Sequence, residues 1–123
     1  MVSKARKAIM EQRLVYFEAT DFYKVVKKQC IRYGYTPLKS AIFGLLALEE
    51  CMNDEQTPDR LPYLSTIGVV ALPEIERLKP DDEEEAQEKR DMLEAYARHD
   101  RKSLHPLLDQ WHRVRETMRK EKN

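Results

Sequence analysis

The segment from Thr36 to Asn53 constrains the fold more than any other, because it predicts a helix that has no polar face. Thr36 is a good N-cap residue, and Pro37 suits the first helical position. Apolar side chains then fall nearly all round the helix: Leu38, Ala41, Ile42, Phe43, Leu45, Leu46 and Leu48. Such a helix must be covered on several sides, either by the rest of this chain or by another chain.

The remaining composition predicts an all-α fold. The 123 residues include three Gly and six Pro, β-branched residues are scattered, and strand-like alternation never runs for long. A chain of this length is expected to form one domain. We therefore predict a single helical domain over 1–123, with about four to five helices and short loops marked by Pro. We expect a non-bundle or loosely packed arrangement with no substantial sheet.

Helix start and stop signals divide the chain into five parts. The first helix ends at Gly34, a good residue just beyond a helix end, and Ser103 is expected to cap the last one. The parts are a basic N-terminal helix (1–34), the apolar helix (36–53), a loop with a short helix (54–79), a charged helix (80–102) and a basic C-terminal helix (103–123). Tyr63–Leu72 is open between a buried strand-like stretch and a short helix. Because no partner strand is visible, we favour a short helix or a packed extended segment there, followed by a turn at Pro73–Leu78.

Two predictions concern side chains within these helices. Helical spacing predicts an apolar side of the first helix, formed by Val25, Val26, Cys30 and Ile31. A basic side is expected opposite it, formed by Lys24, Lys27 and Lys28. In the charged helix, Glu85 and Lys89 are four residues apart and are expected to pair.

Charge divides the chain into three blocks of alternating sign. Residues 1–39 carry nine Lys/Arg against three Asp/Glu, residues 40–88 carry three against thirteen, and residues 89–123 carry ten against six. These balances of +6, −10 and +4 cancel to the net charge of zero. Blocks of one sign usually set which surfaces meet a partner. The acidic middle would repel phosphate, which disfavours nucleic acid as a partner.

Residue types that carry chemistry are sparse, so no enzyme activity, cofactor, metal or small-molecule substrate is predicted. His105 and His112 are seven residues apart with no third ligand in step, and the acidic run Asp81–Glu88 has no turn glycine. No nucleophile motif or phosphate-binding glycine loop is present. Cys30 and Cys51 belong to no CxxC pair and are expected as free, half-buried thiols, as in a reducing compartment. The longest apolar run has eight residues, too short to span a bilayer.

The last helix offers the clearest candidate contact with a partner. Leu107, Trp111, Val114 and Met118 step by four, three and four, so they share one face, and basic residues including Arg115 and Arg119 flank it. A basic amphipathic helix can lie on acidic protein, anionic lipid or nucleic acid. Together with the apolar helix, this face makes up the predicted partner-binding set: Leu45, Leu46, Leu107, Trp111, Val114, Met118, Arg115 and Arg119.

Several short motifs resemble the subunit 7 family of the mitochondrial cytochrome bc1 complex, also called the 14-kDa ubiquinone-binding protein family. A basic first helix leads to Ile31-Arg32-Tyr33-Gly34, similar to the family's Arg-Tyr-Gly-like turn. Arg77-Leu78-Lys79-Pro80, followed by a helix with Ala86, Arg90 and Met92, is similar to the family's Arg-Leu-Pro step and charged helix. An alternative register places Arg60-Leu61-Pro62 at that step. The end, Leu104-His105-Pro106-Leu107-Leu108 and then Arg113–Lys122, resembles its Leu-x-Pro-x-Leu element and basic helix.

This resemblance implies a non-catalytic accessory subunit of ubiquinol–cytochrome c reductase at the matrix side of the mitochondrial inner membrane. Such a subunit packs on cytochrome b and other protein subunits, supports assembly, holds no redox cofactor and has at most peripheral contact with membrane or lipid. The residues leave two alternatives open, which are a soluble helical adaptor that binds a partner helix and an accessory subunit of another inner-membrane complex.

Overall fold

The computed structural model describes residues 20–52, 64–98 and 100–122. They form a helix over 20–33, α2 (Pro37–Met52), α3 (Leu64–Arg77), α4 (Glu83–Arg98), the 3-10 helix η1 (Arg101–Leu104) and α5 (His105–Lys122). No strand occurs in these ranges, so the predicted all-α class is confirmed. The predicted start of the basic N-terminal helix and most of the predicted loop after α2 lie outside the described residues.

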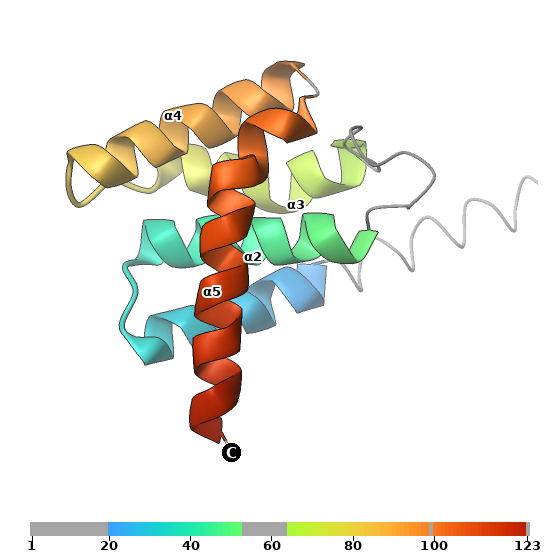
Figure 1. The fold of residues 1–123 in the computed structure, drawn as a ribbon. Coiled ribbons are helices and arrows are strands. Elements are labelled where there is room, and N and C mark those ends of the chain that lie inside the picture. Colours follow the sequence, from blue (N-terminus) through green and yellow to red (C-terminus); the bar gives the residue numbers. More distant parts are fainter. Residues whose placement is uncertain (1–19, 53–63, 99, 123) are drawn as a thin grey trace, which may run out of the picture.

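The apolar helix α2 lies at the centre of the fold (Figure 1). It packs against α3, α4 and α5, and α5 runs across α2 rather than along it. Every residue from Ser40 to Glu49 is buried. The chain therefore covers its own apolar helix, which answers the question that the sequence leaves open.

The connection between helix 20–33 and α2 follows from local chemistry. Gly34 has a φ of 114°, which favours glycine, and its N–H donates to the carbonyl of Ile31 at 3.1 Å. The N–H of Tyr35 reaches the carbonyl of Cys30 at 3.1 Å, which completes a Schellman ending. The hydroxyl of Thr36 then accepts from the N–H of Lys39 at 3.1 Å, so the predicted cap is confirmed.

Gly44 allows helix 20–33 to approach α2 closely. A Cβ placed on Gly44 would lie 3.0 Å from Cδ2 of Tyr23 and 3.1 Å from the backbone oxygen of Tyr23. Both separations are tighter than ordinary van der Waals contact. The glycine therefore brings the two helices closer together than a side chain at this position would allow.

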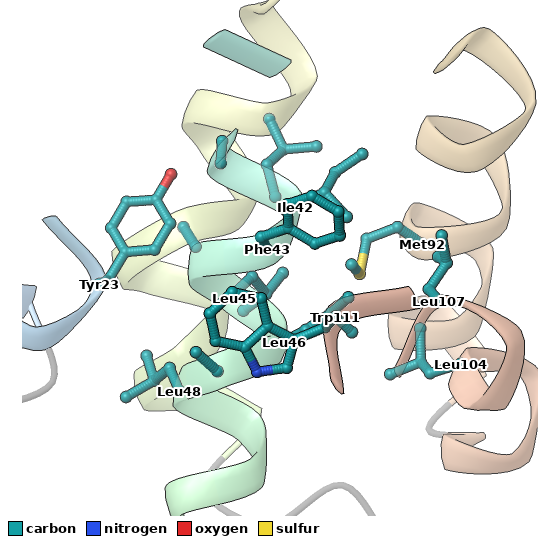
Figure 2. Close-up of a cluster of buried hydrophobic side chains, with 14 of the residues drawn as sticks. Tyr23, Ile42, Phe43, Leu45, Leu46, Leu48, Met92, Leu104, Leu107 and Trp111 are labelled. Atoms are coloured by element: carbon teal, nitrogen blue, oxygen red, sulfur yellow. The ribbon is translucent and has the colours of Figure 1, made fainter. Parts of the chain in front are cut away.

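The core forms around α2 and receives side chains from every described helix (Figure 2). Phe43 lies at its middle, with its ring centroid 5.7 Å from that of Trp111 on α5 and 5.3 Å from that of Tyr35. Figure 2 labels ten residues of this core, which are Tyr23, Ile42, Phe43, Leu45, Leu46, Leu48, Met92, Leu104, Leu107 and Trp111. One continuous core in the described residues fits the prediction of a single domain.

Helix boundaries in the second half differ from the prediction. The predicted short helix and the turn at Pro73–Leu78 are one continuous helix, α3, which contains Pro73 in its interior. Proline lacks the N–H that bonds to the carbonyl four residues earlier, which is why its presence suggested an interruption. The charged helix is shorter than predicted, because the side chain of Asp82 accepts from the N–H of Glu85 at 2.8 Å and caps α4 there.

Two predicted side-chain roles are also corrected. Glu85 does not pair with Lys89: its Oε1 accepts from the hydroxyl of Thr36 at 3.0 Å, while Lys89 donates to the backbone carbonyls of Glu76 and Leu78, at the C-terminal end of α3. Ser103 does not cap the last helix, because α5 begins at His105 and the Ser103 hydroxyl donates to Asp100 Oδ2 at 2.8 Å. Asp100 caps the intervening turn η1 instead.

Candidate partner-binding surface

Four side chains of the predicted partner-binding set lie in the chain's own core. Leu45 and Leu46 have no exposed surface, and Leu107 and Trp111 are each 4% exposed. The helices of this chain supply their cover, because α3, α4 and α5 close around α2. The expectation that these four side chains face a partner is therefore corrected for this structure.

The other four members of that set lie further along α5. Val114 and Met118 are half-buried and pack against the same core. Arg115 donates to Glu50 Oε2 at 3.1 Å, and the exposed Arg119 reaches Glu116 on its own helix at 3.4 Å. Most of the predicted face of α5 is thus used for packing within the chain, and a partner role for Met118 or Arg119 stays a prediction.

The three charge blocks meet one another inside the fold. Lys27 of the first block pairs with Glu74 of the acidic block at 2.5 Å, and Glu50 of the acidic block pairs with Arg115 of the last. His112 Nε2 also lies 3.0 Å from Glu50 Oε1. Blocks of opposite sign therefore hold helices of this chain together, a use that the sequence pattern alone did not reveal.

Glu74 joins helix 20–33 to α3. Its Oε1 accepts from the hydroxyl of Tyr23 at 2.7 Å and from Lys27 at 2.5 Å. Burial alone would raise the pKa of Glu74, but these two hydrogen bonds outweigh it and hold the pKa below its ordinary value. Burial, together with the Glu74 carboxylate, raises the pKa of Tyr23. The cluster is built to keep Glu74 ionised and Tyr23 protonated, as a structural link requires.

Lys39 forms a second link, between α2, α4 and α5. Its Nζ pairs with Glu88, donates to Gln110 Oε1 at 2.6 Å and lies 5.1 Å from the centroid of the Phe43 ring. The side chains of Lys39 and Glu88 are only 12% and 9% exposed. The acidic run Asp81–Glu88 is thus divided: Glu85 and Glu88 turn inward, whereas Asp81–Glu84 stay exposed.

Large exposed apolar side chains in the described residues gather on helix 20–33. They are Phe22, Val25, Ile31 and Tyr33, which are 37%, 54%, 43% and 38% exposed. Tyr23, Val26 and Cys30 form the side of this helix that faces the core. The predicted apolar side of the helix is therefore half right, because Val26 and Cys30 point inward and Val25 and Ile31 do not. Apolar side chains left in water on one element mark a candidate contact with a partner.

Three cations run along the same exposed side. Lys24, Lys28 and Arg32 recur every four residues, are exposed, and form no ion pair with any described residue. We call Lys24, Lys28 and Arg32 the basic row. Asp21 continues the row at its N-terminal end and is also exposed. Helical spacing predicted Lys24 and Lys28 on a basic side opposite Val25 and Ile31, whereas in the structure these two apolar residues flank the row.

At the other end of helix 20–33, Tyr33 marks where α5 comes near. Interaction with the carboxylate of Glu121 on α5 raises the pKa of Tyr33. Tyr33 also stacks on Tyr35, with ring centroids 6.2 Å apart. Tyr33 is therefore held by its neighbours, whereas Phe22, Val25 and Ile31 are the freer apolar residues.

Two residue types that can carry chemistry, metal ligands and thiols, are placed by the structure within the described residues. No group of three or more His, Cys, Asp or Glu side chains among them is arranged to hold a metal ion. Cys30 is a free thiol in the core, fully buried rather than half-buried, and burial raises its pKa to about 11, far from that of a reactive thiolate. The side chain of Cys51 lies outside the described set. Within the described ranges, no helix has the length and apolar character needed to cross a bilayer.

Comparison of this chain with models of protein families, with curated proteins and with solved structures found no match.

Proposed function

We propose that this chain is a non-catalytic helical protein that acts by binding another protein. The observation that carries the proposal is the exposed side of helix 20–33, where Val25 and Ile31 lie beside the basic row. Polar side chains elsewhere in the described fold, such as Glu74 and Lys39, are engaged in holding helices together. On helix 20–33, unpaired cations and exposed apolar side chains lie side by side, a combination suited to contact with a partner.

The narrower form of this proposal is an accessory subunit of a mitochondrial respiratory complex, with ubiquinol–cytochrome c reductase first. It rests on the motifs Ile31–Gly34, Arg77–Pro80 and Leu104–Leu108, which resemble those of the subunit 7 family. In this role the chain would lie at the matrix side of the inner membrane against cytochrome b, and electron transfer would belong to other subunits.

A soluble helical adaptor is the second candidate, and the enclosure of α2 favours it. A subunit that depends on its neighbours to cover an apolar helix would leave that helix open when alone. Here Ser40–Glu49 are buried by the chain itself, so the isolated chain has the core that independent folding needs.

Native purification tests both candidates. Extracts prepared with a mild detergent should contain the chain in an assembly much larger than its own 14.6 kDa. Recovery in a multi-subunit membrane complex that contains cytochrome b supports the accessory subunit, and recovery with a single soluble partner supports the adaptor. A chain that runs as a monomer in every native extract would refute the proposal of a partner-binding protein.

A further inference from the structure

We propose that helix 20–33 docks an acidic amphipathic helix of a partner protein, with the basic row at the centre of the contact and apolar side chains on both flanks. This inference rests on the proposed function and names the chemistry of its partner. It starts from three facts: the helix has a buried side, an exposed side with large apolar residues, and unpaired cations between those residues.

The order of side chains around the helix decides what kind of partner fits. Successive residues in an α-helix are about 100° apart, so Val25 lies about 60° to one side of Lys28 and Ile31 about 60° to the other. The buried residues Tyr23 and Val26 lie on the opposite side of the helix. The basic row therefore points directly away from the core, and an apolar residue stands on each side of it.

This order is the reverse of the one that suits a membrane surface. A helix lying on a bilayer places its apolar residues at the centre of its contact and its lysines at the edges, where they meet head groups. On helix 20–33 a flat bilayer would meet Lys28 first, while Val25 and Ile31 would lie toward the edges. A partner helix can match the observed order, because carboxylates in its central row meet the cations and apolar side chains beside them cover Val25 and Ile31.

Charge along the row adds a direction to the contact. Asp21 stands at the N-terminal end of the row and is followed by Lys24, Lys28 and Arg32, so the row reads one acid and then three bases. The complementary helix carries one base opposite Asp21 and acids opposite the other three. A partner with this pattern in one direction matches the row, and the same pattern reversed places like charges together.

The test uses the full chain and two designed peptides of about 14 residues, the length of helix 20–33. The matched peptide has Lys at the position of its central row opposite Asp21, Glu at the other three positions of that row, and Leu on both flanks. The shuffled peptide has the same composition with Leu in the central row and Glu on the flanks. Anisotropy of the labelled peptides during titration with the chain measures their affinity. The matched peptide is expected to bind at least about tenfold more tightly than the shuffled one.

Charge reversal identifies the basic row as the site. The variant Lys24→Glu, Lys28→Glu, Arg32→Glu is expected to bind the matched peptide about tenfold or more weakly than the unmodified chain. It is expected to bind instead a peptide whose central row carries Lys. The control variant Lys79→Glu, Arg113→Glu, Lys120→Glu changes net charge by the same amount at exposed positions off helix 20–33 and should leave binding unchanged. Far-UV circular dichroism checks that both variants keep their helices.

Three outcomes would overturn the inference. The first is equal binding of the matched and shuffled peptides, and the second is equal loss of binding in the row and control variants. The third is binding of the chain to phosphatidylcholine vesicles containing phosphatidylserine, lost on reversal of the row, without binding of the matched peptide. A native chain found in an assembly while the peptide test fails refutes only this inference, whereas a native monomer refutes the proposed function itself.

Discussion

Replacement of Trp111 by Ala provides the sharpest test of the fold, because Trp111 was expected on sequence grounds to face a partner. In the structure its side chain is 4% exposed and lies against Phe43, at 5.7 Å between ring centroids. If the Trp111 side chain served only to contact a partner, its removal would not change the stability of the isolated chain. If it lies in the core, its removal leaves a cavity beside α2 and lowers that stability.

The magnitude follows from the buried area. A fully buried Trp removes roughly 200 Å² from water, which at about 25 cal/mol per Å² corresponds to about 5 kcal/mol as an upper bound. Measured costs of Trp or Phe to Ala in cores are about 3–5 kcal/mol. We expect Trp111→Ala to lower the free energy of unfolding by about 3–5 kcal/mol, equivalent to a fall in Tm of roughly 10–20 °C.

Two further variants sharpen the result. Trp111→Phe should cost less than about 2 kcal/mol, because the Trp111 Nε1–H is buried with no hydrogen-bond partner among the described residues and its removal offsets part of the lost packing. Phe22→Ala removes an aromatic ring that is 37% exposed and should cost less than about 1 kcal/mol.

Urea and thermal unfolding followed by far-UV circular dichroism measure all three variants against the unmodified chain. A fall of less than about 1 kcal/mol for Trp111→Ala, matching that of Phe22→Ala, would refute the placement of Trp111 in the core.

Three other predictions concern the links around α2, each measured as a change in the urea midpoint. Gly44→Ala gains about 1 kcal/mol of helix propensity but pushes a methyl group against Tyr23, so we expect a net loss of stability of about 1 kcal/mol. A gain in stability would show that helix 20–33 and α2 can move apart without cost. Because the pKa of Glu74 is lowered in the folded chain, its contribution to the free energy of unfolding is present above the ordinary carboxyl pKa and is lost as pH falls through the lower folded value. Glu74→Gln should therefore destabilise the chain near pH 7 and reduce the loss of stability below about pH 4. If the variant loses stability in acid as the unmodified chain does, this reasoning is contradicted. Lys39→Met leaves the carboxylate of Glu88 buried without its cation and should lower the free energy of unfolding by about 3 kcal/mol. Adding Glu88→Gln in the double variant should restore part of that loss. A loss under about 1 kcal/mol for Lys39→Met would mean that water reaches Glu88.

Local signals were the most reliable guide to the fold. Thr36-Pro37 and Gly34 located the start of α2 and the end of helix 20–33 correctly, because caps and positive φ angles depend on a few neighbouring residues. Pro73 misled the prediction for α3, since the cost of an interior proline can be met by packing that is not visible from the local sequence.

Tertiary contacts decided what the sequence left open. The all-round apolar character of α2 required cover, but the pattern did not say that α3, α4 and α5 of the same chain provide it. Charge blocks likewise suggested outside partners, whereas Glu74 and Glu50 show that blocks distant in sequence pair within the fold.

The candidate surface was the hardest part to predict from sequence. Val25 and Ile31 are apolar and stand next to core residues in the chain, so apolar periodicity assigned them to the buried side. A helical wheel whose buried side is centred on Tyr23, Val26 and Cys30 places Val25 and Ile31 outside that side. The direction of the buried side is known only once the neighbours of helix 20–33 are placed.

The central position of α2 has a consequence for synthesis of the chain on the ribosome. The helix emerges early, yet Trp111 and Leu107, which cover it, are made some sixty residues after Met52. At about 5–20 residues per second, the nascent polypeptide carries α2 without the cover of α5 for on the order of several seconds. During that interval, the apolar surface of α2 that α5 later covers can contact other chains, which is the kind of exposure that chaperones limit.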